Sequence, residues 1–237
     1  MEQIAFVTGA DRGLGQALTV GLLERGWRVF AGQYIADWPQ LDELAVRFPQ
    51  SLHIVPLDVS SIESVRAAAQ SVSEMVDHVD LLISNAGIGG GRAEFREGLD
   101  YEAMHRTYNV NSLGAVRLVE SFLPLTDRGS MKRLCFVSSE VGSIALSVRQ
   151  GAFGYCMSKT ALNMAVRIMF NHLYPEGYTF RLYQPGWMRS YMGGEKGTMG
   201  DMEPEESAAQ ALPLFLNDRD DEGRLAMIDY LGAEWPF

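Results

Sequence analysis

The residues best suited to chemistry include a tyrosine and a lysine that lie four residues apart. Tyr155 and Lys159 form a Tyr-x-x-x-Lys pattern. Because residues four apart share one face of a helix, the phenol and the ammonium are expected to be neighbours. A nearby cation favours the phenolate. Proton transfer near neutrality needs the phenol pKa to fall by roughly three units, or about 4 kcal/mol, which we expect Lys159 and a cationic ring to supply together.

Two serines precede this pair and add a further polar group. Ser138 and Ser139 follow the apolar run 134–137, which predicts a buried strand. A hydroxyl at the end of that strand, facing the tyrosine, would hold a substrate oxygen while the phenol transfers a proton. Tyr-x-x-x-Lys patterns also arise by chance on ordinary helices, so the enzyme hypothesis needs support from the rest of the chain.

The start of the chain gives that support. Residues 4–7 form an apolar run, a turn with Gly9, Gly13 and Gly15 follows, and apolar residues then recur at helical spacing. A strand, a glycine-rich turn and a helix in this order predict a dinucleotide-binding unit. The glycines let the backbone approach a pyrophosphate, and the free N–H groups of the helix face its charge. The alternative is a turn glycine and tight helix packing without a ligand.

The second predicted strand, 28–32, leads into residues 33–37, which we expect near the adenosine ribose of a dinucleotide. An acidic residue at the strand end would favour NAD, and a basic residue would accommodate the phosphate of NADP. Neither stands there, and the chain has Tyr34 instead. Arg12, inside the glycine turn, is the cation that could reach that phosphate. A surface arginine without this role fits the sequence nearly as well.

Polar and small residues also follow the later predicted strands. Asp58 follows the strand 52–57 and is expected either to cap locally or to bind an adenine amine. Ser60 and Glu63 have the spacing of a capping box at the start of the next helix. The small residues at 84–87 follow another strand and would let a ligand pass close to the backbone.

Two further features are a polar residue inside a predicted helix and a segment rich in glycine and methionine. Asn111 is an amide inside the helical pattern 101–123, and a buried amide needs partners. Either its neighbours satisfy it, or it bends the helix and relays hydrogen bonds to Lys159. Residues of about 187–202 are rich in glycine and methionine without a clear period. We expect a mobile substrate loop there, with a plain surface loop as the alternative.

The alternation of strands and helices predicts the fold. We expect an α/β protein with a three-layer, doubly wound parallel sheet of about seven strands, Rossmann-like, with helices on both faces. A chain of 237 residues suits a single domain over 1–237. The polar motifs each follow a strand, which is where open α/β sheets bind their ligands.

The composition excludes several classes of protein. A net charge of −10 repels polyanions, so neither nucleic acid nor an anionic membrane is an expected partner. Two cysteines, Cys135 and Cys156, are too few for a disulfide framework or a zinc site, and no metal is expected. The sequence has no apolar run of transmembrane length and no signal-peptide pattern. We therefore expect a cytoplasmic protein with reduced thiols.

In combination, these motifs resemble those of the short-chain dehydrogenase/reductase family over essentially the whole chain. The resemblance is carried by Thr8-Gly9-x-x-x-Gly13-x-Gly15, Asp58-Val59, Ser84-Asn85-Ala86-Gly87, Pro185-Gly186 and the set Asn111, Ser139, Tyr155 and Lys159. Ser84 replaces an asparagine of the family pattern. A closer likeness, carried by residues 138–144, 185–194 and 229–232, is to the carbonyl-reductase-like branch that includes the C-factor and sniffer proteins.

This resemblance implies an NAD(P)-dependent oxidoreductase that transfers a hydride between nicotinamide and a carbonyl or alcohol substrate. It implies that Tyr155 is the general acid and base, and that Lys159 lowers its pKa and binds the nicotinamide ribose. It also implies that Ser139 holds the substrate carbonyl and that Asn111 positions a water molecule. The sequence from Ser139 to Tyr155 is slightly longer than is usual in the family, which makes Ser143 the alternative hydroxyl.

The implied cofactor is NADP or NAD. Members of this branch carry an arginine where Tyr34 stands, and its loss weakens the case for NADP. Arg12 partly restores that case, and the missing acidic marker of NAD leaves NADP favoured. The implied cofactor-binding residues are Gly9, Asp11, Arg12, Gly13, Leu14, Gly15, Tyr34, Asp58, Val59, Asn85, Ala86, Gly87, Tyr155, Lys159, Pro185, Gly186, Trp187 and Met188.

The substrate is a small-molecule carbonyl or alcohol that the sequence does not define further. Either an adaptable apolar pocket or plain packing is expected from Phe153, Trp187, Met188, Tyr191, Met192 and Met199. The resemblance implies a homodimer or homotetramer formed through the helices that hold Asn111 and Tyr155. The alternatives to an enzyme of this family are a non-catalytic NAD(P)-binding signalling or regulatory protein and a methyltransferase with a similar glycine turn.

Overall fold

A computed structural model describes residues 2–36, 38–91, 93, 95–192 and 196–237 of the chain. Its centre is a sheet of eight strands, in which β1 to β7 are parallel and β8 pairs antiparallel with β7. The strands are β1 (Ile4–Thr8), β2 (Arg28–Gln33), β3 (Leu52–Pro56), β4 (Leu81–Ser84), β5 (Arg133–Val137), β6 (Thr179–Gln184), β7 (Met227–Asp229) and β8 (Glu234–Trp235).

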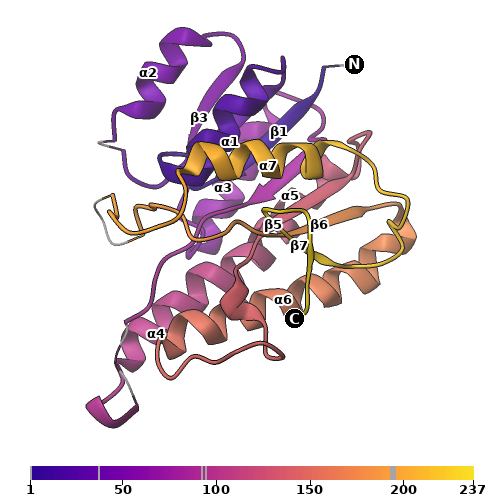
Figure 1. The fold of residues 1–237 in the computed structure, drawn as a ribbon. Coiled ribbons are helices and arrows are strands. Elements are labelled where there is room, and N and C mark those ends of the chain that lie inside the picture. The colour runs from indigo at the N-terminus through magenta and orange to yellow at the C-terminus, as the bar shows by residue number, and fades with distance from the viewer. Residues whose placement is uncertain (1, 37, 92, 94, 193–195) are drawn as a thin grey trace.

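Helices connect these strands and cover the sheet (Figure 1). The α-helices are α1 (Gly13–Leu23), α2 (Gln40–Arg47), α3 (Ile62–Ser73), α4 (Tyr101–Tyr108), α5 (Gly114–Thr126), α6 (Phe153–Leu173) and α7 (Pro204–Leu216). Shorter helical turns are η1 (Phe95–Glu97), η2 (Asn109–Leu113), η3 (Glu140–Gly142) and η4 (Tyr174–Glu176).

The strand order is β3-β2-β1-β4-β5-β6-β7-β8, so the direction of winding reverses between β1 and β4. Alternate residues of each central strand face opposite sides, and two separate hydrophobic cores result. Phe6 of β1 belongs to the core under α3, α5 and α6, whereas its neighbour Val7 belongs to the core under α1, α2 and α7. The predicted three-layer doubly wound fold is confirmed, with β8 as a short strand beyond the seven expected.

The central strands are buried on both faces, which explains their nearly continuous apolar sequences. All five residues of β1 and all five of β5 are buried. The parallel register aligns the ends of neighbouring strands, with Thr8 opposite Gly32 and Ile83 opposite Cys135. The polar segments that follow β1, β4, β5 and β6 therefore meet at one edge of the sheet.

The helical pattern 101–123 is interrupted in the structure. Asn109–Leu113 form a π-helical turn, η2, between α4 and α5. Such wider turns often mark functional sites, because they displace side chains that a regular helix would align differently. At the start of α3, Ser61 rather than Ser60 is the N-cap, and its hydroxyl accepts a hydrogen bond from the N–H of Ser64 at 3.2 Å.

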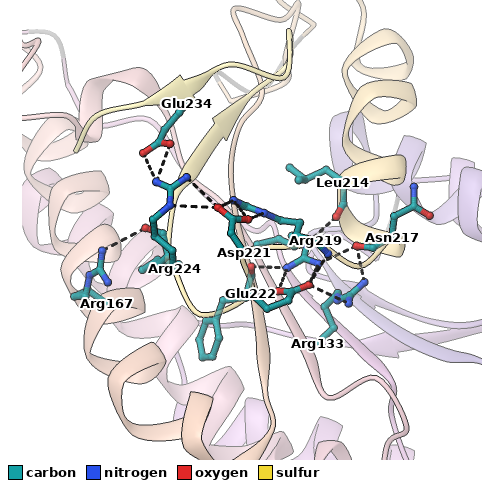
Figure 2. Close-up of polar contacts among 12 residues, drawn as sticks. Arg133, Arg167, Leu214, Asn217, Arg219, Asp221, Glu222, Arg224 and Glu234 are labelled. Carbon is teal, nitrogen blue, oxygen red and sulfur yellow. Dashed lines mark hydrogen bonds and ion pairs between the residues drawn. The ribbon is translucent and has the colours of Figure 1, made fainter.

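Away from this edge, a cluster of charged side chains fixes the segment after α7 to the sheet (Figure 2). The guanidinium of Arg181 donates to the carboxylate of Glu222 at 2.6 Å and to the carbonyl of Asn217 at 2.8 Å. The guanidinium of Arg133 donates to the same carbonyl at 3.1 Å and pairs with Asp218. We call Arg133, Arg181, Asp218 and Glu222 the C-terminal cluster.

Candidate active site

A cavity of about 360 Å³ lies at the edge where the polar segments meet. It is lined by residues that follow β1, β2, β3, β4, β5 and β6 and by the face of α4 and η2 that points toward them. The predicted site residues that line it are Gly9, Asp11, Arg12, Gly13, Leu14, Tyr34, Asp58, Val59, Asn85, Ala86, Gly87, Tyr155, Lys159, Pro185 and Met188.

The glycine turn requires glycine both for its backbone conformation and for close packing of the chain on itself. Gly9 and Gly13 have φ angles of 62° and 58°, and a Cβ atom on Gly15 would lie 2.1 Å from the carbonyl oxygen of Gly9. The turn leads directly into α1, whose first N–H groups are available to an anion. This tight turn at the start of a helix fits the pyrophosphate of a dinucleotide.

Hydrogen bonds with the segment after β4 hold the glycine turn in place. The hydroxyl of Thr8 accepts from the backbone N–H groups of Asn85 and Ala86, each at 2.9 Å. The side-chain amide of Asn85 donates in return to the carbonyl of Thr8 at 2.9 Å. The segments after β1 and β4 therefore form one connected wall of the cavity.

Tyr155 lies at the first turn of α6 and faces Ser139 at the end of β5. Burial raises the pKa of the Tyr155 phenol above its ordinary value of 10, and a hydrogen bond with the Ser139 side chain opposes this by lowering it. Desolvation of the phenolate therefore outweighs the nearby hydrogen bond, and the lowering that we expect from Lys159 together with a cationic ring stays a prediction. Ser143 instead accepts from the N–H of Leu146 at 3.2 Å, so Ser139 is the serine that faces the phenol.

Lys159 lies one turn further along α6 and is almost completely buried, with 3% of its surface exposed. Its ammonium lies 5.9 Å from the centre of the Tyr155 ring and donates to the carbonyl of Val137 at 2.9 Å. Burial lowers its pKa from 10.5 to about 8. No carboxylate among the described residues forms an ion pair with it, so its charge is stabilised mainly by a carbonyl dipole.

Asn111 lies in η2 and is fully engaged by hydrogen bonds. Its side-chain oxygen accepts from the N–H of Ile88 at 2.8 Å, and its amide nitrogen donates to the carbonyl of Ile88 at 2.9 Å and to the hydroxyl of Ser158 at 3.0 Å. The π-helical turn thus brings Asn111 against both the loop after β4 and α6. Neighbouring groups therefore satisfy the hydrogen-bonding groups of the Asn111 side chain, as one hypothesis predicted. Asn111 also lies where the helix is distorted, as the other predicted.

The opposite end of the cavity is lined by residues that follow β2 and β3, and Asp58 there makes the local contacts of the capping alternative. One carboxylate oxygen of Asp58 accepts from the N–H and the hydroxyl of Ser60 at 2.8 and 2.6 Å. Asp11 accepts from the N–H of Ile35 at 3.1 Å, which ties the segment after β2 to the glycine turn. Tyr34 lines this end of the cavity and is 67% exposed.

Some predicted site residues do not line the cavity. Gly15 and Gly186 lie behind its wall, Ser139 and Asn111 reach it only through their contacts with neighbouring groups, and Trp187 is 57% exposed outside it. Of the predicted substrate residues, Met188, Tyr191 and Met192 line the cavity, Met199 is exposed, and Phe153 lies 5.9 Å from Phe95 between ring centres. Asp37, Gly193 and Gly194, which belong to predicted segments, lie outside the described residues.

The cavity also contains residues that the sequence analysis missed. Arg106 and Asn109 lie three positions apart on α4 and η2, and both contribute to the wall together with Val110. Spacings of three and four on a helix that also carries Asn111 are a signal that would have found them. In the described part of the chain, no cluster of histidine, cysteine, aspartate or glutamate is arranged to hold a metal ion, and no helix is long and apolar enough to cross a bilayer.

Comparisons with known proteins agree with this geometry. The profile of the short chain dehydrogenase family matches residues 3–200. C-signal of Myxococcus xanthus is 37% identical over 159 residues, which are 67% of this chain and 93% of that protein. The structure of NADPH bound carbonyl reductase from chicken fatty liver has a TM-score of 0.88 and 28% identity and covers 100% of this chain and 99% of its own. Carbonyl reductase Sniffer of D. melanogaster has the same fold, with a TM-score of 0.88 and 22% identity over 100% of both chains.

The family match covers most of the chain and confirms the predicted resemblance, including the carbonyl-reductase-like branch. The cavity at the carboxyl ends of the strands and the glycine turn are the parts of the fold that this family uses for its cofactor. The chain therefore belongs to the short chain dehydrogenase family of oxidoreductases and uses NAD(P) as its cofactor.

Proposed function

We propose that the protein is a carbonyl reductase that prefers NADP, with Tyr155 as its general acid in reduction and its general base in oxidation. The observation that carries the proposal is that Tyr155 and Lys159 line one end of the cavity, with the Ser139 side chain beside the phenol. The Ser139 side chain acts on the phenol pKa, which supports a site in which both hydroxyl groups hold one carbonyl oxygen. The bound nicotinamide supplies the hydride for reduction or accepts it in oxidation.

Each protein group has a distinct role in the proposed reaction. The Tyr155 phenol protonates the carbonyl oxygen, and the Ser139 hydroxyl holds that oxygen in place. Lys159 stabilises the phenolate that remains, since its ammonium lies 5.9 Å from the ring centre and no carboxylate of the described residues neutralises it. Asn111, held between Ile88 and Ser158, fixes the loop and helix that surround Lys159 and positions a water molecule for proton return.

Tyr155→Phe is the central test of this proposal. We expect loss of turnover with aldehydes, ketones and quinones, while the affinity for NADPH measured by fluorescence titration changes little. Loss of turnover together with loss of cofactor binding would instead indicate a structural role for Tyr155. Wild-type binding of NADPH without turnover of any carbonyl would favour the alternative of a regulatory NAD(P)-binding protein, which the name of the relative C-signal makes worth testing.

The preference for NADP rests on Arg12. Its guanidinium lies beside the segment after β2, 5.0 Å from the centre of the Trp38 ring, where the ribose phosphate of NADP is expected. Arg12→Leu is expected to weaken NADPH binding by about tenfold or more and to leave NADH binding nearly unchanged, because one charge-assisted contact is worth about 1.5–3 kcal/mol. Equal effects on both cofactors would remove Arg12 from the discrimination.

Assembly and location complete the proposal. Exposed apolar side chains lie on α4 to α6, namely Tyr108, Leu113, Val116, Met157, Met164 and Ile168. They support association into a homodimer or homotetramer through these helices, which light scattering would test. The free thiols of Cys135 and Cys156 suit the cytoplasm. We also propose that residues 1–237 act as one domain and that the segment of about 187–202 is its substrate loop.

A further inference from the structure

Two aromatic side chains from distant segments meet at the entrance of the cavity. Trp38 follows β2, and Tyr191 follows β6. Their ring centres lie 5.5 Å apart with an angle of 82° between the ring planes, which is an edge-to-face arrangement. This geometry lies within the favourable range for aromatic pairs. Tyr191 lines the cavity, and its ring contacts the ring of Trp38. The pair therefore joins the segment after β2 to the segment after β6.

Each partner also contacts the glycine turn. The Tyr191 ring lies 3.6 Å from the position that a Cβ atom on Gly13 would occupy, so it covers the turn at the start of α1. The Arg12 guanidinium lies over the Trp38 ring, 5.0 Å from its centre. Since this turn and the N-terminus of α1 fit a pyrophosphate, the aromatic pair lies above the middle of the dinucleotide site.

Contacts with the rest of the protein hold both the segment that leads to Trp38 and the segment that leads to Tyr191. Asp11 holds the N–H of Ile35, which fixes the segment that leads to Trp38. Met188 forms an isolated parallel bridge with Met202, and the N–H of Asp201 donates to the carbonyl of Trp187 at 2.7 Å. Tyr191 therefore extends from a loop whose base is paired. Separation of the two rings requires one of these anchored segments to move.

We propose that Trp38 and Tyr191 retain the bound dinucleotide, acting as a clasp whose edge-to-face contact must open before the cofactor leaves. This inference rests on the proposed function, because the retained ligand is the cofactor of the same site. The clasp makes Trp38 and Tyr191 positioning residues rather than catalytic residues. It also gives Tyr191, which was predicted as a residue of the substrate pocket, a role at the cofactor.

The test is the rate of NADPH release, measured by stopped-flow displacement with excess NADP⁺ and followed by the fluorescence of NADPH itself. An aromatic pair of this kind corresponds to about 2- to 10-fold in a rate or equilibrium constant. Tyr191→Ala and Trp38→Ala are each expected to release NADPH faster by this factor. Tyr191→Phe keeps the ring and is expected to release NADPH at the wild-type rate.

The double variant and a distant control make the test specific. If the two rings act through each other, Trp38→Ala with Tyr191→Ala releases NADPH no faster than the faster single variant. Tyr174→Ala removes a comparable aromatic pair, with Phe170 at 5.1 Å, far from the cavity, and should leave release unchanged. Thermal unfolding without cofactor should show a small and similar loss of stability in the three alanine single variants, because each loses one aromatic pair near the surface.

Three possible results would support or overturn the proposed clasp. Faster release in both alanine variants, without additivity, supports the clasp. Unchanged release in either alanine variant, or fully additive effects, overturns the clasp and leaves the proposed carbonyl reductase intact. Failure of the wild-type protein to bind NADPH or NADH at all overturns both the clasp and the proposed function.

Discussion

Lys159 in the cavity and the arginines of the C-terminal cluster are all buried cations, but their surroundings differ. Arg133 and Arg181 are each 1% exposed, and their guanidinium groups are surrounded by carboxylates and backbone carbonyls. Figure 2 shows these surroundings for Arg133. Lys159 is 3% exposed and has the carbonyl of Val137 as its hydrogen-bond acceptor among the described residues. One region thus neutralises its buried charges, and the other leaves a buried charge nearly uncompensated.

This difference separates a structural site from a chemical one. Burial raises the pKa of the Glu222 carboxyl, but hydrogen bonds from Arg181 and the N–H of Arg219 bring it below its ordinary value, so this group stays charged. At Lys159, burial without a counter-charge lowers the pKa to about 8. An ammonium that is so little stabilised by the protein is available to stabilise a charge that forms during a reaction. Perturbed groups of this kind are typical of functional sites.

The most severe test of the comparison is Lys159→Met. Activity with the best carbonyl substrate is expected to fall by roughly 10²- to 10⁴-fold, because the phenolate of Tyr155 loses its nearby cation. The measurement is kcat/KM under saturating NADPH. Lys132→Met, a lysine replaced at the other end of β5, serves as the matched control and should retain activity. Full activity in the Lys159 variant would show that the uncompensated charge has no chemical role.

For Arg181→Met we expect the opposite of Lys159→Met, namely a large loss of stability and little loss of activity per folded molecule. Breaking a buried ion pair costs about 3–5 kcal/mol, because the remaining partner is left buried and unpaired. Here that partner is Glu222, and the carbonyls of Leu214 and Asn217 also lose a donor. Urea unfolding measures the loss.

A second replacement sharpens this test. The double variant Arg181→Met with Glu222→Leu removes both partners of the ion pair, so no buried carboxylate remains unpaired. It should therefore be more stable than Arg181→Met alone. If the single variant unfolds at the wild-type urea concentration, the C-terminal cluster does not stabilise the fold in the way described.

The titration of Lys159 gives a smaller effect with a defined sign. Its pKa is about 8 in the folded protein and 10.5 in the unfolded chain, so the unfolded state binds more protons between these values. The free energy of unfolding should therefore rise as pH increases from about 8 to about 10.5, by up to about 3 kcal/mol from this group. The measurement is the difference between wild type and Lys159→Met in urea unfolding across this range.

Lys159→Met should accordingly be more stable than wild type near neutral pH, and this advantage should shrink as pH rises. The comparison of two proteins cancels the contributions of titrating groups that do not interact with Lys159. A constant difference across the range would mean that the folded protein does not disfavour the charged form of Lys159.

The two regions also differ in how far the sequence predicts them. Tyr155 and Lys159 belong to one helix, and Ser139 follows the adjacent strand, so local spacing was sufficient to propose their meeting. Gly9, Gly13 and Gly15 are similarly local, because a strand, a turn and a helix follow one another directly. The fold was predictable for the same reason, since its strands and helices alternate in a regular order.

The remaining contacts depend on segments that are distant in sequence. Arg133 and Arg181 stand in or next to apolar runs, and nothing near them in the chain indicates that Asn217, Asp218 and Glu222 will surround their guanidinium groups. The clasp of Trp38 and Tyr191 is formed in the same way. The raised pKa of Tyr155 was missed because spacing reveals the nearby cation but not the depth of burial.

The smallest expected effect comes from the exposed edge of the same C-terminal region. Arg224 pairs with Glu234 at 2.7 Å and with Asp221 at 3.0 Å, but all three side chains are about half exposed to solvent. Water and ions screen such pairs, so Arg224→Gln should leave the urea midpoint within experimental error at high salt and lower it only slightly at low salt. If this variant were as unstable as Arg181→Met, burial would not be the property that gives the arginines their structural role, because the two sites share the same chemistry and differ mainly in exposure.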